Sequence, residues 1–373
     1  MDPFRDQPLR EPPHIAVFSS SKVGNFVVTI PLLRGLKRKY PGCVLDFYGS
    51  ETTAEFEAGC EHIDFAFALY SKRDDFLEGL TAAVRERVAL AGPYDLAINC
   101  DEFSELNVVA VSAVRPQFIA GAGLTRDFRA RLDPGGDAVQ RMLKDKDWNS
   151  SAFLERYRNF LTSNYIGEIF CRMAYVHTDF YALELPSQRP DFDVPDVLVH
   201  ATATRGAKLW PIEHWLELAR WCAGQSLTVG LVGSPPAVQQ ALYHSGSLED
   251  ELLARSAVID LRGRTSLIQL AGAFEQARAC VSVDAGPMHI AAAAGCPTIA
   301  LFGNDTEGDG ASPVHLWAPR MANVHRVAST YKCRVCMDNN FKNDPCLVDG
   351  HPCMSALPAD AVIAKLAEIL RDR

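Results

Sequence analysis

The feature that most constrains this chain is an alternation of short apolar runs with amphipathic stretches, repeated in both halves of the sequence. Such alternation is typical of parallel β-sheets whose strands are joined by right-handed helical crossovers. The runs that we predict as strands are 15–19, 44–48 and 95–100 in the first half and 197–200, 227–232, 258–261, 279–283 and 298–302 in the second. The predicted fold class is therefore α/β, with two Rossmann-like, doubly wound parallel-sheet domains that face a central cleft.

A proline-containing segment at 185–195 separates the two halves. With 373 residues the chain is too long for one ordinary hydrophobic core. We predict an N-terminal domain over residues 1–185, with a charged helical insertion near 127–180, and a C-terminal domain over 196–355. Around Pro31 two interpretations stay open: a helix capped by Thr29 with Pro31 in its first turn, or a longer helix that Pro31 kinks.

Charge and hydropathy exclude two classes of partner. A formal net charge of -9 argues against nucleic acid, because phosphate backbones require a basic face. The N-terminus is charged and proline-rich, without the apolar core of an export signal, and no apolar run approaches the roughly 20 residues that span a bilayer. We therefore expect a cytoplasmic protein that neither binds nucleic acid nor inserts into a membrane.

The most specific motif follows the predicted strand 279–283 and reads Asp284-Ala285-Gly286-Pro287-Met288-His289. It opens a helix rich in small residues, and a helix N-terminus offers unpaired N–H groups to a diphosphate. Asp284 is a candidate for binding sugar hydroxyls, and His289 either donates to phosphate or packs in the core. The alternative interpretation is an ordinary turn in which Asp284 caps the helix.

A second candidate set follows the predicted strand 197–200. Two hydroxyls and two cations gather there, which is what a leaving pyrophosphate requires: Thr202, Thr204, Arg205 and Lys208. The alternative is a solvated surface loop, where most lysines are found.

Four cysteines cluster near the C-terminus: Cys333, Cys336, Cys346 and Cys353. A Cys-x-x-Cys with two further cysteines within twenty residues favours a tetrahedral thiolate site for structural zinc or iron. Reduced thiols in a loop and a labile disulfide are the alternatives.

Taken together, these motifs resemble the ADP-heptose:lipopolysaccharide heptosyltransferases of glycosyltransferase family 9. The matching stretches are 24–37, 204–215, 263–270 and 281–303, together with the cysteine tail. The resemblance implies a GT-B fold, inversion at the anomeric carbon and no catalytic metal. It also implies an acceptor-binding N-terminal domain, a nucleotide-sugar-binding C-terminal domain, and a terminal helix within 356–373 that returns toward the N-terminal domain. Some relatives that modify autotransporter proteins hold iron in a similar tail.

By position in the family's motifs, Thr204 and Lys208 are expected to contact the donor diphosphate. Asp284 is expected to contact the donor sugar, with backbone contacts from Ala285 and Gly286 to phosphate.

Three departures from the family pattern matter. The general base that usually follows a glycine in the first loop is replaced by Asn25, and an amide cannot accept that proton. Asp101 or Glu102, at the end of the strand 95–100, is the expected substitute; a readily activated acceptor such as an amine, or an impaired enzyme, are the alternatives. A glutamate for the ribose is missing, which leaves Gln239 as the candidate there and the base open. The third departure is Ala285, where a threonine is common.

The sequence thus predicts an inverting glycosyltransferase that moves a heptose from ADP-heptose to a hydroxyl or amine of a protein, a natural product or a lipopolysaccharide core. Two alternatives remain: a non-catalytic nucleotide-sugar-binding or assembly module of the same fold, and a GT-B nucleotide-sugar epimerase.

Overall fold

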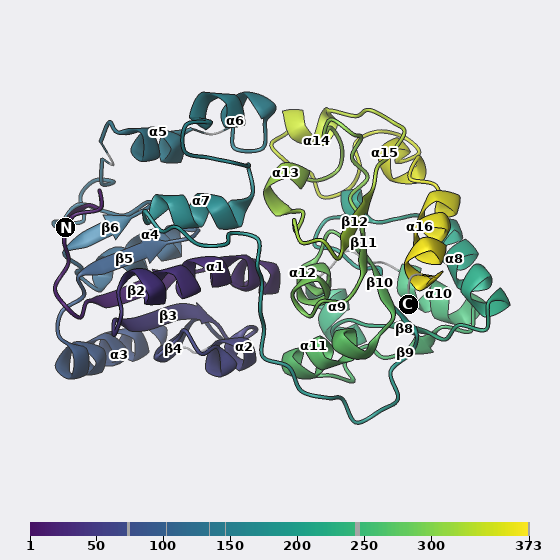
Figure 1. The fold of residues 1–373 in the computed structure, drawn as a ribbon, viewed down its shortest axis with the longest axis horizontal. Helices are drawn as coiled ribbons and strands as arrows, with labels where there is room; N and C mark the ends of the chain where they lie inside the picture. Colours follow the sequence, from purple (N-terminus) through teal and green to yellow (C-terminus); the bar gives the residue numbers. More distant parts are fainter. Residues whose placement is uncertain (73–74, 102, 134, 146, 243–246, 372–373) are drawn as a thin grey trace. The chain divides into compact units, whose positions relative to one another are not determined.

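In a computed structural model the chain forms two compact units, residues Met1–Glu184 and Leu185–Arg373. The structure describes residues 1–72, 75–101, 103–133, 135–145, 147–242 and 247–371. Each unit is an α/β body built on one parallel six-stranded sheet, which confirms the predicted α/β class with two parallel-sheet domains (Figure 1).

The first unit has the strand order β1-β6-β5-β2-β3-β4. Its strands are β1 (Asp2–Pro3), β2 (His14–Phe18), β3 (Val44–Ser50), β4 (Phe65–Tyr70), β5 (Leu96–Asn99) and β6 (Phe118–Ala120). Its helices are α1 (Val23–Lys39), α2 (Ala54–Gly59), α3 (Phe76–Ala91), α4 (Glu105–Ala113), α5 (Ala138–Lys144), α6 (Ser151–Tyr157) and α7 (Ile166–Met173). The chain runs from β2 to β3 and β4 on one side and then crosses to β5 and β6 on the other. This reversal makes the carboxyl ends of β2 and β5 the switch point of the sheet, where ligands of such folds bind.

Helix α1 decides between the two interpretations of Pro31. It begins at Val23 and contains Pro31 in its interior, so Thr29 does not cap it. The Thr29 hydroxyl instead donates to the Asn25 carbonyl oxygen at 2.7 Å, one turn earlier. The helix is buried from Phe26 to Leu36, and this burial outweighs the backbone hydrogen bond that the proline removes.

The second unit has the strand order β12-β11-β10-β7-β8-β9. Its strands are β7 (Val197–His200), β8 (Val229–Leu231), β9 (Ile259–Asp260), β10 (Ala279–Val283), β11 (Thr298–Leu301) and β12 (Val324–Val327). The main helices are α8 (Ile212–Gly224), α9 (Pro236–Leu242), α10 (Leu248–Arg255), α11 (Leu267–Gln276), α12 (Gly286–Ala293) and α16 (Ala359–Arg371), with short turns η1 (Gly206–Lys208), α13 (Val314–Trp317), α14 (Val335–Asp338) and α15 (Pro352–Ser355). Here the switch point lies between β7 and β10, because the chain leaves these neighbouring strands in opposite directions.

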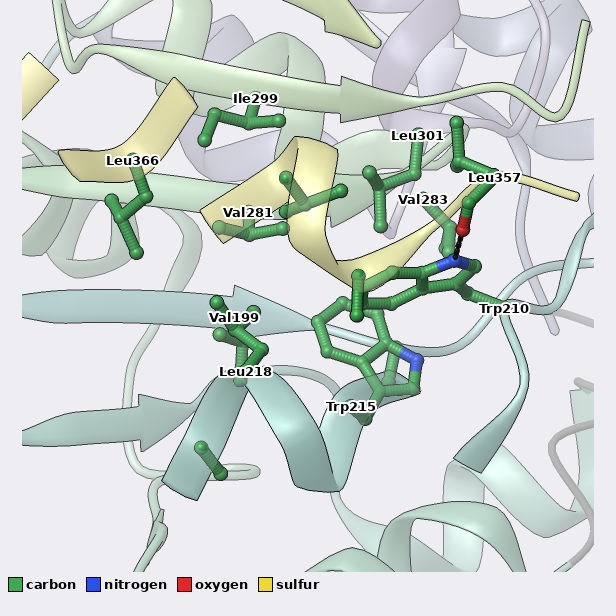
Figure 2. Packing of buried hydrophobic residues seen from close by; sticks show 14 of the residues in the cluster. Val199, Trp210, Trp215, Leu218, Val281, Val283, Ile299, Leu301, Leu357 and Leu366 are labelled. Atoms are coloured by element: carbon green, nitrogen blue, oxygen red, sulfur yellow. Dashed lines mark hydrogen bonds between the residues drawn. The ribbon is translucent and has the colours of Figure 1, made fainter. Parts of the chain in front are cut away.

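Two buried tryptophans pack in the hydrophobic core of the second unit (Figure 2). The ring centroids of Trp210 and Trp215 lie 4.9 Å apart at an interplanar angle of 83°. The Trp210 indole N–H donates to the Leu357 carbonyl oxygen at 2.8 Å, which satisfies a buried donor and ties the segment after η1 to the C-terminal region.

The C-terminal helix α16 belongs to this second core. Its apolar face, with Val362, Leu366 and Ile369, is buried in the same cluster as Trp210. The helix packs on α8 and on strands β10–β12, so its apolar residues are used within the second unit. The expectation that the helix within 356–373 returns toward the first unit stays a prediction. Within the described ranges, every helix is too short or too polar to cross a bilayer.

Candidate functional site

The switch point of the second unit brings together the two motifs that the sequence singled out. The loop after β7 ends in η1, whose last residue is Lys208, and β10 leads directly into Asp284. Lys208 Nζ lies 2.6 Å from Asp284 Oδ2, and the two side chains are only 15% and 7% exposed. Burial alone would raise the pKa of Asp284, but the charge of the adjacent Lys208 ammonium group holds it below the ordinary range. The carboxylate is therefore ionised at neutral pH.

Beside this ion pair stands the N-terminus of α12. Ala285 precedes the helix in an extended conformation and its methyl group cannot cap it, while Gly286 begins it. The backbone N–H groups and positive dipole end of such a terminus favour an anion. Lys208 approaches the same point, and because its charge is paired with that of Asp284, the N–H groups of the helix terminus are the positive groups without a counter-charge of their own.

His289 lies one turn into α12 and is 3% exposed. Burial, assisted by the charge of Lys208 and opposed by that of Asp284, lowers its pKa to about 4. The imidazole is therefore neutral at pH 7. Its Nδ1 is buried and has no hydrogen-bond partner among the described residues.

Two residues of the predicted diphosphate set have other partners. The Thr202 hydroxyl is buried and donates to the Glu249 carboxylate, which also pairs with Arg262. The Arg205 guanidinium bonds to the Asn343 carbonyl oxygen and side chain, as well as to the Ala311 carbonyl oxygen. We therefore withdraw Thr202 and Arg205 from the diphosphate set. These partners lie more than forty residues away in sequence, which is why motif spacing did not reveal them.

Thr204 and Gln239 remain candidates. Thr204 is exposed on the same loop as Lys208. Gln239, on α9, is 2% exposed, and its Nε2 has no partner in the described part of the chain. This amide approaches the backbone of Gly233, since a Cβ added there would lie 2.4 Å from it. A buried amide without a partner can donate to a ligand, and Gln239 therefore stays the candidate contact for a nucleoside.

Ser312 is a site residue that the sequence analysis missed. It lies in the loop after β11, is fully buried, and stands near enough to Asp284 to help hold the pKa of that carboxyl below its ordinary range. Asn304 fixes this loop by donating to the Ser312 carbonyl oxygen at 2.7 Å. A serine inside an acidic, glycine-containing loop carries no distinctive sequence signal.

The acidic loop itself supplies Asp305, Glu307 and Asp309, whose carboxylate oxygens lie within 4.8 Å of one another. Lys332 pairs with two of these carboxylates, and Arg334 bonds to Asp309 at 2.9 Å. Cations of the protein thus already neutralise part of this cluster.

The four tail cysteines gather in one region. Cys333, Cys336 and Cys353 are buried and Cys346 is half-buried. Burial and then the charges of the other three raise the pKa of Cys353 to about 12, so the thiols are close enough to interact. The Cys336 sulfur accepts N–H groups from Asn343 at 3.3 Å and from Arg205 at 3.6 Å.

The chemistry of this donor set fits zinc or iron. Four thiols cluster, and N–H groups donate to one sulfur, as the neighbours of metal-bound thiolates commonly do. No three of the sulfurs lie within 4.8 Å of one another in the described structure, so the tail is more open than a filled tetrahedral site.

In the first unit, Asp101 follows β5 at the sheet's switch point. Its backbone N–H donates to Asn99 Oδ1 at 2.9 Å. Burial raises the pKa of Asp101 above the ordinary range, against the opposing charge of Lys22 from the loop after β2. Asn25 is half-buried in the first turn of α1. Glu102, the other candidate base, lies outside the described residues.

A shallow cavity of about 360 Å³ opens at the carboxyl ends of β2, β3 and β4. Its lining is rich in hydroxyl groups, from Ser21, Ser50, Thr52, Tyr70 and Ser71. One carboxylate and one ammonium group, Glu51 and Lys72, also line it, so its formal charge is balanced.

Tyr70 connects this cavity to the switch point. Its hydroxyl lies 2.5 Å from Ser104 Oγ and donates to Asn107 Oδ1 at 2.9 Å. Burial raises the pKa of Tyr70, and the charge of Asp101 adds to this effect. The hydroxyl-lined cavity and Asp101 are therefore electrostatic neighbours.

The family model and the similar proteins of known function agree on one family. Residues 138–345 match the model for glycosyltransferase family 9 (heptosyltransferase). Lipopolysaccharide heptosyltransferase 1 of Pseudomonas aeruginosa is 33% identical over 154 residues, which are 40% of this chain and 38% of that protein. Lipopolysaccharide heptosyltransferase 1 of Escherichia coli K12 is 24% identical over 79% of this chain and 89% of that protein.

Solved structures show the same fold. A family 9 glycosyltransferase from Veillonella parvula superposes with a TM-score of 0.68 at 18% identity, covering 98% of this chain and 99% of that one. The iron-containing dodecameric glycosyltransferase TibC from enterotoxigenic E. coli gives a TM-score of 0.58 at 13% identity, covering 98% and 80%. TibC has also been solved with ADP-D-β-D-heptose.

Proposed function

This chain belongs to glycosyltransferase family 9, and from that premise we propose that it transfers a heptose from ADP-heptose to a hydroxyl or amine of an acceptor, with inversion and without a catalytic metal. The observation that carries the proposal is the Lys208–Asp284 ion pair at the start of α12, with a contact of 2.6 Å. It combines a cation, a helix terminus and a carboxylate, which are the groups that a sugar diphosphate requires.

In the proposed reaction, Lys208 and the N–H groups at Gly286 hold the diphosphate, while Asp284 accepts hydrogen bonds from the sugar hydroxyls. Thr204 and neutral His289 add contacts to the donor. As the acceptor oxygen or nitrogen attacks the anomeric carbon, the bond to the diphosphate oxygen breaks and the electron pair leaves with ADP. Lys208 stabilises that developing charge because it stands in a site largely shielded from water.

The acceptor proton goes to Asp101 in this proposal. Its raised pKa makes it a better base than an ordinary aspartate, since the pKa of an effective base lies closer to the working pH. Asn25 occupies the place where the family carries its base, and its amide can only orient the acceptor. A carboxylate after β5 thus takes the role that the family gives to a residue at the position of Asn25, in the first turn of α1.

The hydroxyl-lined cavity beside Tyr70 is the proposed place for the acceptor. Its balanced charge, with one carboxylate and one ammonium group, favours a neutral, hydroxyl-rich acceptor over a phosphorylated one. Natural products, protein hydroxyl groups and sugar cores of this kind remain the candidate classes. Gln239 is the proposed contact to the nucleoside, and the cysteine tail is the proposed site of a structural zinc or iron.

The test is turnover. The purified chain is incubated with ADP-heptose and a panel of neutral and phosphorylated sugar acceptors, and both ADP release and the heptosylated product are followed by mass spectrometry. Transfer to a neutral acceptor with inverted anomeric configuration supports the proposal. Donor binding without transfer to any acceptor favours the alternative of a non-catalytic binding module.

A further inference from the structure

The segment that carries the four cysteines, here called the cysteine tail (residues 333–353), reaches back to the loop that carries Lys208, here called the Lys208 loop (residues 201–209). Two backbone groups of the loop bond to one residue of the tail. The Ala207 N–H donates to the Asp344 carbonyl oxygen at 2.9 Å, and the Gly206 N–H donates to Asp344 Oδ1 at 3.2 Å. From the other end of the tail, His351 Nε2 lies 2.8 Å from the Ala207 carbonyl oxygen.

Arg205 makes the same connection through its side chain. Its Nε donates to the Asn343 carbonyl oxygen at 2.7 Å and its Nη2 to Asn343 Oδ1 at 3.2 Å. Its Nη1 donates to the Ala311 carbonyl oxygen at 3.0 Å, next to the buried Ser312 in the loop after β11. One guanidinium therefore ties the Lys208 loop, the tail and the loop after β11 together.

The cysteines enter this network at Cys336. Its sulfur accepts an N–H from Asn343 at 3.3 Å and one from Arg205 at 3.6 Å. Asn343 is 6% exposed, and its amide also donates to the Pro345 carbonyl oxygen at 2.9 Å. The side chain of Asn343 is thus held on both sides, between a cysteine sulfur and the arginine of the Lys208 loop.

Lys208 depends on these contacts because its own secondary structure is a single turn of three residues, η1. So short a turn has little stability by itself, and the positions of its residues follow from the groups that bond to it. We propose that the cysteine tail is a positioning element of the donor site, in which Asn343, Asp344 and Arg205 fix the place of Lys208 at the diphosphate. The inference rests on the proposed role of Lys208 in diphosphate binding.

The consequence is a linkage between the tail and the donor. If an ordered tail strengthens diphosphate binding, then diphosphate binding must order the tail to the same extent. The four thiols sit in the same segment, so a change in their bonding acts on Lys208 through Asn343 and Arg205. Asn343, Asp344 and Arg205 are positioning residues in this account, and they do not themselves touch the diphosphate, which Lys208 and the start of α12 hold.

Titration calorimetry with ADP on two variants of one residue tests the proposal. Asn343→Asp keeps the acceptor oxygen for Arg205, whereas Asn343→Leu removes it. We expect ADP affinity within about threefold of wild type for Asn343→Asp and a loss of about tenfold or more for Asn343→Leu. Arg334→Ala is the matched control, because Arg334 lies in the same tail but bonds to Asp309. Unchanged affinity in Asn343→Leu, or an equal loss in the control, would overturn the proposal.

Hydrogen exchange of the wild-type protein gives an independent readout if the Leu variant does not fold. ADP should slow amide exchange in the tail around 339–351 as well as in the Lys208 loop. Protection confined to the Lys208 loop and the start of α12 would contradict a positioning tail. A wild type that binds no nucleoside diphosphate at all would instead refute the proposed function on which this inference rests.

Discussion

Lys208 Nζ and Asp284 Oδ2 lie 2.6 Å apart although 76 positions separate the two residues in the sequence. They meet because one follows β7 and the other follows β10, the neighbouring strands at which the strand order of the second sheet switches. The pair is largely buried, and removal of either partner leaves the other charge uncompensated. Lys208→Ala should therefore leave the buried Asp284 carboxylate without its counter-charge. It should also remove the cation that stabilises the leaving ADP.

For Lys208→Ala we expect kcat to fall by about 100-fold or more, which corresponds to about 3 kcal/mol of transition-state stabilisation. Steady-state kinetics with ADP-heptose measures the loss. Lys332→Ala is the control, since Lys332 pairs with carboxylates of the same unit and is 55% exposed. A Lys208→Ala enzyme with near-wild-type turnover would show that another group stabilises the diphosphate.

Asp101→Asn should lower kcat for transfer by about 100-fold or more and leave the affinity for the donor unchanged. The base must be ionised, so activity falls as pH falls through the pKa of Asp101, which lies above that of an ordinary aspartate. Lys22→Ala removes the charge that opposes this rise and should move the acidic limb of the kcat/KM profile to higher pH. If the Asn variant turns over normally, the base lies elsewhere.

Thr52→Trp should fill the hydroxyl-lined cavity of the first unit without disturbing the core, because Thr52 is exposed on the cavity wall. The KM for the acceptor should rise by about tenfold while the affinity for ADP stays the same. Thr52→Ser keeps the hydroxyl and serves as the control. Equal acceptor KM values in all three proteins would place the acceptor elsewhere.

Glu57 gives a prediction for stability. It is 2% exposed, accepts hydrogen bonds from the Ser50 N–H and the Thr53 hydroxyl, and burial raises its pKa from 4.5 to about 7. Between these two values the folded state binds more protons than the unfolded state, so this group reduces stability as pH rises from 4.5 to about 7.

Glu57→Gln removes that titration. The variant should exceed the wild type in free energy of unfolding by about 2 kcal/mol at pH 8, and the difference should shrink toward pH 5. Urea unfolding at both pH values measures it. Glu55→Gln on the exposed side of the same helix is the control, and a difference independent of pH would rule out the titration of Glu57 as its cause.

The metal proposal predicts about one zinc or iron per chain in protein purified without chelator, because four thiolates complete one tetrahedral site. Cys336→Ser and Cys346→Ser should each lower the metal content measured by mass spectrometry. Cys60→Ser, in the first unit, should not. A metal content near zero in the wild type would leave the four cysteines as free thiols.

Strands of the second sheet were predictable from the sequence. The runs 197–200 and 279–283 coincide with β7 and β10, since each is a short, wholly buried apolar run followed by a polar loop. The start of α1 was ambiguous because Pro31 usually begins or breaks a helix, and only tertiary burial explains its place in the interior. The sequence also could not predict which core the apolar face of α16 packs against. Periodicity identifies an apolar face but not the residues that it contacts.

For the candidate site, the same reasoning placed Lys208, Asp284 and the start of α12 because strand ends in a parallel sheet converge at one edge. It assigned Arg205 to the diphosphate because arginine beside threonine and lysine favours phosphate. In the structure, Asn343 lies 138 positions later in the chain and takes that guanidinium instead. Contacts of such sequence separation follow from packing, and no local pattern encodes them.

The measurement that tests the central claim most directly is a thermal shift of the wild type and of Lys208→Ala with ADP, GDP, UDP and the two epimers of ADP-heptose. A ligand that binds the native state raises the unfolding temperature by mass action, so donor choice is read without knowledge of the acceptor. The account predicts the largest shift with an ADP-heptose and its loss in Lys208→Ala. A larger shift with GDP or UDP, or no shift with any nucleotide, would contradict an ADP-heptose donor bound at Lys208 and Asp284.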